Sequence, residues 1–130
     1  MKKKEFVKCV YFSRQEVKKE TGLEFRGELE ENVPKFYFCV REEDRIAAAE
    51  VLRRKRDFYI AEVSMNNEDK KLLEALLESV WECAGYTGSR LVIDPEVARD
   101  AEDILRKLGF TRIDKYWAKI PTESYIYSIC

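Results

Sequence analysis

The sequence predicts an α/β protein of the α+β type, with a mixed and mostly antiparallel central sheet of six to seven strands flanked by helices. Segments rich in β-forming residues recur along the chain, and two segments with apolar residues at helical spacing lie among the later ones. Short polar turns separate the three middle strand segments, which is typical of an antiparallel meander. The 130 residues are 45% hydrophobic and 38% charged, enough to bury the core of one domain over residues 1–130.

The N-terminal part of the chain predicts one strand and one short helix. Residues 5–12 alternate and are rich in β-forming side chains, so we expect a strand there. Ser13 and Glu16 form a capping box, in which the serine hydroxyl accepts from a helical amide and the glutamate reaches back to the cap. Gly22 ends this helix because glycine tolerates a positive φ. The polar residues 23–35 are expected to form an irregular connector.

The middle of the chain predicts three antiparallel strands followed by the strongest helix. The strands cover residues 36–40, 46–52 and 58–65. Asn66 or Asn67 is a suitable N-cap for the helix that follows. The apolar face of that helix repeats with helical spacing and consists of Leu72, Leu73, Leu76, Leu77, Val80, Trp81 and Ala84.

The C-terminal part predicts a buried strand, a second helix and two further strands. Residues 91–93 are continuously apolar, as expected of a strand that is covered on both faces. Asp94 and the proline after it begin a helix that ends at Gly109. Residues 111–120 are predicted to form one strand, and residues 125–129 the last one.

The composition excludes several classes of function. Lys plus Arg total 24 and Asp plus Glu total 25, a balance that leaves no positive field to attract nucleic acid. No apolar segment approaches the ~20 residues that span a membrane, and we expect no signal peptide. The chain has no histidine, and Cys9, Cys39, Cys83 and Cys130 form no Cys-x-x-Cys pair, so no metal site is predicted. These features predict a reduced cytoplasmic protein whose cysteines fill core gaps, with a composition that resembles that of thermophile proteins.

A more specific pattern lies in residues 36–120. A strand meander is followed there by strand, helix, strand, helix and strand, and the last helix ends in the tail Ile104-Leu105-Arg106-Lys107-Leu108-Gly109-Phe110. Twelve residues separate Val63 from the pair Leu76-Leu77. This order, this tail and this spacing resemble the GCN5-related N-acetyltransferase (GNAT) superfamily, whose members commonly carry Leu-Tyr-x-x-x-Gly-Phe at the tail.

The resemblance implies the fold of an acyl-CoA N-acyltransferase and the transfer of an acetyl group from acetyl-CoA to an amine substrate. In that family, backbone amides at a helix N-terminus bind the pyrophosphate of the cofactor beside a glycine-rich segment. Carried onto this chain, the cofactor-binding positions lie at the end of the third meander strand and at the start of the helix after it. They are Val63, Ser64, Met65, Lys70, Lys71 and Leu72.

The chain departs from the family pattern at this segment and at a catalytic position. Glu68 stands where the family has Gln or Arg, and Lys71 and Leu73 stand at two glycine positions. The acids Glu68 and Asp69 would repel a pyrophosphate, at a cost of ~1 kcal/mol for each close pair of charges in water. Leu105 replaces the tyrosine that in many members protonates the departing thiolate, and leucine cannot donate a proton.

Acetylation of an amine needs a base and a donor to the oxyanion, and the sequence offers candidates for both. The donor is expected among the backbone amides of a strand bulge around residues 63–65. The candidate bases are Glu62, Glu50 and Asp94, each of which also fits the pattern of a surface carboxylate.

Tyrosine and cysteine side chains offer further candidates for catalytic groups. Tyr116 and Tyr125 are candidates to replace the missing phenol, although tyrosines in strands commonly serve packing. Cys39 and Cys83 have no histidine to activate them, which excludes a Cys-His nucleophile. The predicted catalytic residues are therefore Glu62, Asp94 and Tyr116.

Three hypotheses follow from these patterns. The first is an acyl-CoA-dependent N-acetyltransferase that binds its cofactor between the strand ending at Met65 and the strand starting at Leu91. The second is a non-catalytic module on the same fold that has lost the cofactor and binds a protein partner. The third is a homodimer in which the apolar residues 125–129 add a strand to a partner's sheet. The predicted function is an acetyltransferase-like domain, with catalysis left open between the first two.

Overall fold

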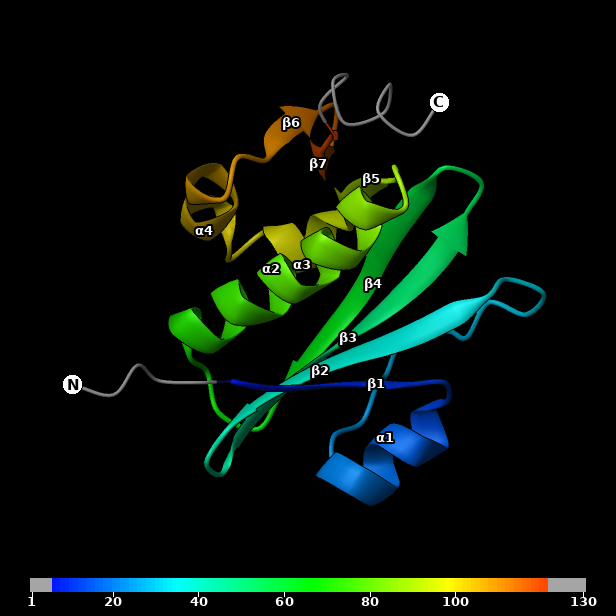
Figure 1. Ribbon diagram of the computed structural model, residues 1–130, viewed down its shortest axis with the longest axis vertical. Helices are drawn as coiled ribbons and strands as arrows, with labels where there is room; N and C mark the ends of the chain where they lie inside the picture. The colour runs from blue at the N-terminus through cyan, green and yellow to red at the C-terminus, as the bar shows by residue number, and fades with distance from the viewer. Residues whose placement is uncertain (1–5, 122–130) are drawn as a thin grey trace.

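The computed structural model describes residues 6–121 and shows a seven-stranded mixed sheet with helices packed on it (Figure 1). The predicted α+β class, with a mixed sheet of six to seven strands flanked by helices, is confirmed. Across the sheet the strand order is β1-β2-β3-β4-β5-β7-β6. In chain order the elements are β1 (Val7–Tyr11), α1 (Arg14–Thr21), β2 (Lys35–Glu42), β3 (Arg45–Arg54), β4 (Asp57–Met65), α2 (Lys70–Tyr86), β5 (Arg90–Ile93), α3 (Pro95–Ala98), α4 (Glu102–Lys107), β6 (Thr111–Ile113) and β7 (Tyr116–Lys119).

The sheet changes character at β4. Strands β2 to β4 form the predicted antiparallel meander, and β1 pairs antiparallel with β2. Strands β4 and β5 are parallel and are connected through α2. A parallel connection needs such a crossover, because the chain must return to the starting end of the sheet. The pairing of β4 with β5 extends only from Asp57 to Ile60, so the sheet is open beside the carboxyl-terminal half of β4.

Two apolar cores lie on opposite faces of the sheet. The larger core packs α2, α3 and α4 on alternate strand residues, including Phe38, Val40, Ala47, Ala49, Phe58, Ile60, Leu91 and Ile93. The smaller core packs α1 and the connector against the other face through Val17, Leu23, Phe25, Tyr37, Cys39, Ile46 and Ala48. Each fully buried Val, Leu, Ile or Phe contributes roughly 1.5–3 kcal/mol relative to exposure, so the larger core dominates the stability.

The capping box of the first helix is confirmed. The Ser13 hydroxyl accepts from the Glu16 amide at 3.1 Å, and the Glu16 carboxylate accepts from the Phe12 amide at 3.0 Å. Gly22 follows the helix with φ 79°, in the left-handed region that glycine adopts without steric cost.

The predicted N-cap of the second helix is wrong, since Asp69 rather than Asn66 or Asn67 caps α2. The Asn66 side chain instead closes the edge between β3 and β4. Its carbonyl oxygen accepts from the Ile46 amide at 2.9 Å, and its amide nitrogen donates to the Asp44 carbonyl at 2.6 Å. Asn66 therefore closes the end of β4, and α2 begins at Lys70 after three further residues, the last of which is the N-cap Asp69.

Two elements of the C-terminal part also differ from the predictions. The single helix predicted from Asp94 to Gly109 is interrupted, because the Ala101 amide bonds to the Ala98 carbonyl in a tight turn between α3 and α4. The apolar spacing continues across this turn, so the pattern did not reveal it. The strand predicted over residues 111–120 is the hairpin β6–β7, whose turn contains Asp114 with φ 58°. The strand predicted over residues 125–129 lies outside the described residues.

A buried ion pair joins α1 to the centre of the sheet. Glu50 of β3 is only 3% exposed, which corrects its prediction as a surface carboxylate. Arg14 donates to both carboxylate oxygens of Glu50, at 2.6 and 2.9 Å, and the Tyr37 hydroxyl donates to one of them at 2.8 Å. Burial, together with the Glu50 carboxylate, raises the pKa of Tyr37 above its ordinary value. The phenol therefore remains a proton donor to Glu50 at neutral pH.

Within residues 6–121, no helix is both long enough and apolar enough to cross a membrane.

Removal of the Arg14 charge should destabilise the fold. Arg14→Met leaves Glu50 buried without its cation, and we expect a loss of about 2–3 kcal/mol, since Arg14 still reaches solvent. The matched control is Arg99→Met, an exposed arginine paired with Glu96, with an expected change within about 0.5 kcal/mol. Urea unfolding at neutral pH gives both values.

A second substitution separates charge from packing at this pair. Glu50→Gln placed on Arg14→Met removes the uncompensated charge and should recover part of the lost stability. Equal stability of the Arg14→Met variant and the wild-type protein would contradict the role given to this pair.

Candidate functional site

A cleft of about 690 Å³ opens where β4 and β5 separate. It is bounded by the carboxyl-terminal half of β4, the N-terminus of α2 and the segment from α3 to α4. Its apolar lining is made by Val63, Met65, Leu73, Val97 and Ile104. The cleft lies at the place where the sequence predicts a cofactor, beside the end of the third meander strand.

The backbone of β4 is open along this cleft. The Asn66 amide donates to the Ile46 carbonyl of β3 at 3.2 Å, which fixes the alternation of backbone groups along β4. The N–H and C=O groups of Val63 and Met65 therefore point away from β3, toward the cleft. On that side the last bond between the two strands comes from the Asp94 amide to the Ile60 carbonyl, at 3.1 Å. Beyond it, β4 presents a short strand edge.

The bulge that bends β4 lies earlier than predicted. Ile60 pairs with Val51 and Glu62 pairs with Glu50, so Ala61 is the extra residue, in place of the expected residues 63–65. An extra residue bends a strand and increases its twist, which carries the end of β4 away from β5. At this position Glu50 of β3 lies opposite Glu62 of β4. Each of the two carboxylates accepts hydrogen bonds from other groups.

The N-terminus of α2 is occupied by its own cap. The Asp69 carboxylate accepts from the amides of Lys71 and Leu72 at 2.9 and 3.2 Å, and it also pairs with the Arg45 guanidinium. Two of the amides that the family resemblance assigns to a pyrophosphate are thus already bonded to a carboxylate. The Lys70 side chain does line the cleft.

The charged side chains around the cleft are mostly acidic. Lys70 is accompanied by Glu62, Glu68, Asp69, Glu96 and Asp100. The acids exceed the single cation even after Glu62, Asp69 and Glu96 are discounted for their own partners. Such a lining attracts a cation and repels a pyrophosphate. The interaction energy of each close pair of charges is ~1 kcal/mol in water and larger in a cleft.

Glu62 holds the connector on the sheet. Its two carboxylate oxygens accept from the Arg26 amide at 2.7 Å and from the Gly27 amide at 2.8 Å. A Cβ at position 27 would lie 3.0 Å from one of these oxygens, so glycine permits this close approach. The predicted base thus has a structural bond on each oxygen.

Asp94 and Tyr116 meet a tyrosine that the sequence analysis did not single out. The Tyr59 hydroxyl donates to Asp94 at 2.5 Å, while the other Asp94 oxygen caps α3 by accepting from the Glu96 amide at 2.9 Å. The rings of Tyr59 and Tyr116 pack edge to face with centroids 6.1 Å apart. Burial raises the pKa of Tyr59, with a further contribution from Asp94. The only sequence signal for Tyr59 was its alternate position on a strand.

The three predicted catalytic residues do not line one pocket. Glu62 lines the cleft between β4 and β5, whereas Tyr116 lines a separate hollow of about 260 Å³ together with Tyr59 and Val92. The predicted cofactor residues Val63, Met65 and Lys70 do line the cleft. Ser64 lines a third, adjoining pocket on the connector side, which also contains Glu62.

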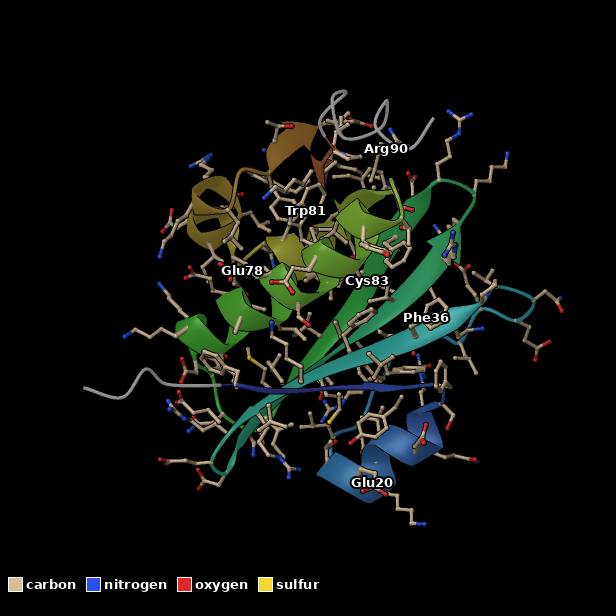
Figure 2. The ribbon with its side chains drawn as sticks, viewed as in Figure 1. Glu20, Phe36, Glu78, Trp81, Cys83 and Arg90 are labelled. Atoms are coloured by element: carbon tan, nitrogen blue, oxygen red, sulfur yellow. The ribbon has the colours of Figure 1, made fainter. Side chains whose placement is uncertain are left out.

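The cysteines differ in exposure. Cys39 is buried and fills a gap in the smaller core as predicted, but Cys9 and Cys83 are exposed, which corrects that prediction for them. Burial raises the pKa of the Cys39 thiol to about 12, and burial also raises the pKa of Cys83. Figure 2 shows Cys83 on the side of α2 near Phe36 and Trp81 on the side toward β6 and β7. Neither thiol is activated as a nucleophile.

Within the described part of the chain, no group of three or more His, Cys, Asp or Glu side chains is arranged to hold a metal ion.

No protein-family model, curated protein or solved structure matches this chain. The function is therefore inferred from the site itself.

Removal of the Glu62 carboxylate should release the connector. Glu62→Ala deprives the Arg26 and Gly27 amides of their acceptor, and we expect faster hydrogen exchange at both, with a stability loss of about 1 kcal/mol because the freed amides reach water. Glu68→Ala removes an exposed carboxylate of the same cleft and should leave these two exchange rates unchanged. Unaltered protection in the Glu62→Ala protein would refute this role.

The buried Cys39 thiol should make stability fall at alkaline pH. Its pKa is about 12 in the folded protein and about 8.5 in the unfolded chain, so between these values only the unfolded state loses the proton. The contribution is fully present below pH about 8.5 and is lost toward pH 12, by up to about 1.4 kcal/mol per pH unit. Unfolding free energies of the wild-type and Cys39→Ala proteins should converge as pH rises. Parallel pH curves would show that Cys39 ionises alike in both states.

Proposed function

We propose that this chain is an acetyltransferase-like domain of the GNAT type that acts as a protein-binding module, taking an extended basic segment of a partner into the cleft between β4 and β5. Support for the GNAT-type fold comes from the parallel pairing of β4 with β5, their separation beyond Ile60, and the helix that begins beside this opening. The observation that carries the binding function is the acidic, self-capped end of the cleft, where Asp69 occupies the α2 amides.

The shape and backbone of the cleft favour an extended ligand. Val63 and Met65 direct backbone donors and acceptors into it, and a peptide that runs along β4 satisfies them by adding a strand. Their side chains, with Leu73 and Val97, provide apolar contacts for alternate residues of such a peptide. The bound peptide would thus continue the sheet beyond Ile60, where β5 separates from β4.

The charges of the cleft favour a basic ligand. Glu68 and Asp100 line it and lie in the exposed rim. Lysine or arginine side chains of a bound segment would meet these carboxylates, with about 1 kcal/mol or less for each exposed pair and a strong dependence on salt. Such pairs select the sign of the partner's charge more than they add affinity.

The second candidate is an N-acetyltransferase that uses acetyl-CoA and an amine substrate. It is favoured by the open backbone edge at Val63 and Met65, which offers amides to an extended cofactor arm and to an oxyanion. Against it stand the Asp69 cap on the helix amides, the aliphatic Leu105 at the acid position, and the separation of Glu62 from Tyr116. The two candidates differ in the sign of the charge that the cleft binds.

A pair of matched peptides tests the proposed function. A Val-Lys-Val-Lys-Val peptide should shift the NMR signals of the Val63 and Met65 amides, whereas Val-Glu-Val-Glu-Val should not. In the double variant Glu68→Lys and Asp100→Lys, binding of the lysine peptide should weaken by about tenfold or more, which corresponds to 1.4 kcal/mol. Glu20→Lys reverses a carboxylate on α1 (Figure 2) and should leave the affinity unchanged. No shift with the lysine peptide, or equal shifts with both peptides, would refute the basic-segment proposal.

A thermal melt with millimolar acetyl-CoA tests the enzyme candidate in the same protein. A cofactor at 100 times its dissociation constant stabilises by about 2.7 kcal/mol, and we expect no such rise in Tm for the wild-type chain. A rise in the wild-type protein would overturn the proposal in favour of the acetyltransferase.

A further inference from the structure

We propose that two copies of this chain pair through their β1 strands, edge to edge and antiparallel, with Cys9 on the twofold axis. Strand β1 (blue in Figure 1) is the outermost strand on its side of the sheet, and among the described strands it pairs only with β2. Strands β2 and β3 separate it from β4 and the cleft, so this interface is independent of the ligand of the cleft.

The outer edge of β1 carries free backbone groups. The Arg53 amide donates to the Pro34 carbonyl at 2.9 Å, which shows that odd-numbered residues of β3 bond to β2. By alternation, Cys39 of β2 bonds toward β1, and Cys9 opposite it bonds back. The residues on either side of Cys9 therefore turn their N–H and C=O groups outward.

These outward residues are Lys8 and Val10. The next outward amide, that of Phe12, is already held by the Glu16 carboxylate at 3.0 Å. The part of the edge that can accept another strand is thus short and is centred on Cys9. A closed twofold pairing suits such an edge, since each copy uses up the free groups of the other and no edge is left to continue a fibre.

The side chains of this edge are unusually apolar for a free surface. Val7 is 60% exposed, Val10 46% and Phe12 68%, and they make up three of the seven large apolar side chains exposed within residues 6–121. Sheets that stay monomeric commonly protect their edges with proline, bulges or several charges. Strand β1 contains neither proline nor bulge, and its only charge is Lys8.

An antiparallel pair centred on Cys9 covers all three exposed side chains. Val10 lies opposite the partner's Lys8, Val7 opposite the partner's Tyr11, and Phe12 opposite the partner's Phe6. The free N–H and C=O groups of Lys8 and Val10 bond to each other across the axis. Val7 and Cys9 are exposed on the face that bears α1, so that helix leaves the edge accessible.

The charge pattern selects this register over its neighbours. A pair centred on Lys8 sets two lysines directly opposite each other, which is destabilising. A pair centred on Val10 requires the Phe12 amide, which Glu16 already holds. In a pair centred on Cys9, each Lys8 lies opposite Val10 of the other copy. It also keeps its ion pair with Glu82 of α2, at 3.6 Å.

The test combines solution mass with an edge substitution. Light scattering over micromolar to millimolar concentrations should give a dimer for the wild-type chain. Val10→Pro removes only an outward N–H, which β2 does not use, and should raise the dimer dissociation constant by more than about tenfold. Val10→Lys should do the same by placing two lysines opposite each other. Tyr86→Lys replaces an exposed aromatic residue elsewhere and should leave the dimer intact.

Cross-linking identifies the axis. In a background of Cys83→Ser and Cys130→Ser, a short bis-maleimide should join two chains through Cys9, because directly opposite residues of a non-hydrogen-bonded pair lie about 4.5 Å apart at Cα. The same background with Cys9→Ser should remain uncross-linked. A wild-type monomer at millimolar concentration, or a dimer that persists in both Val10 variants, would overturn the proposal. A dimer that persists in both variants would show that the two copies meet through another surface.

Discussion

The buried carboxylate of Glu50 is the constraint on which the rest of this structure depends. A charge in the middle of a sheet is tolerated only with a cation and hydrogen bonds beside it, and Arg14 and Tyr37 provide them. Because Arg14 belongs to α1, this requirement fixes the helix on the sheet and places the connector after it. The connector in turn reaches Glu62, the residue opposite Glu50, and bonds to it through two amides.

The pairing of Glu50 with Glu62 also sets the geometry of the cleft. The extra residue Ala61 lies where Glu50 and Glu62 pair, and it bends the end of β4 away from β5. The opening that results has an uncovered strand edge, apolar walls and acidic side chains. Asp69 neutralises the nearby helix amides and holds Arg45, so the local electrostatics do not favour an anion. The open end of this mixed sheet thus presents a surface suited to a cation.

The main elements were predictable because their signals are local. Alternation, capping residues and helical spacing identified the meander, the capping box at Ser13 and the long helix. Local signals failed where several neighbouring residues could fill one role, as at the N-cap of α2. Asn66 was a suitable cap by residue type, but its side chain closes the edge between β3 and β4, and Asp69 caps the helix instead. They also failed at the turn between α3 and α4, since apolar spacing continues through it. The burial of Glu50 could not be inferred, because its partners lie 36 and 13 residues away in sequence.

The sequence by itself determined the fold class, the order of the main elements up to β5 and the acidic residues before the long helix, because these depend on residue type and short-range spacing. Only the tertiary structure decided what each candidate side chain does. It assigned Glu62 to the connector and Asp94 to a helix cap and Tyr59, and it placed Tyr116 in another hollow. The physical reason is that a carboxylate or phenol takes its role from the groups that surround it in space, and those come from distant parts of the chain.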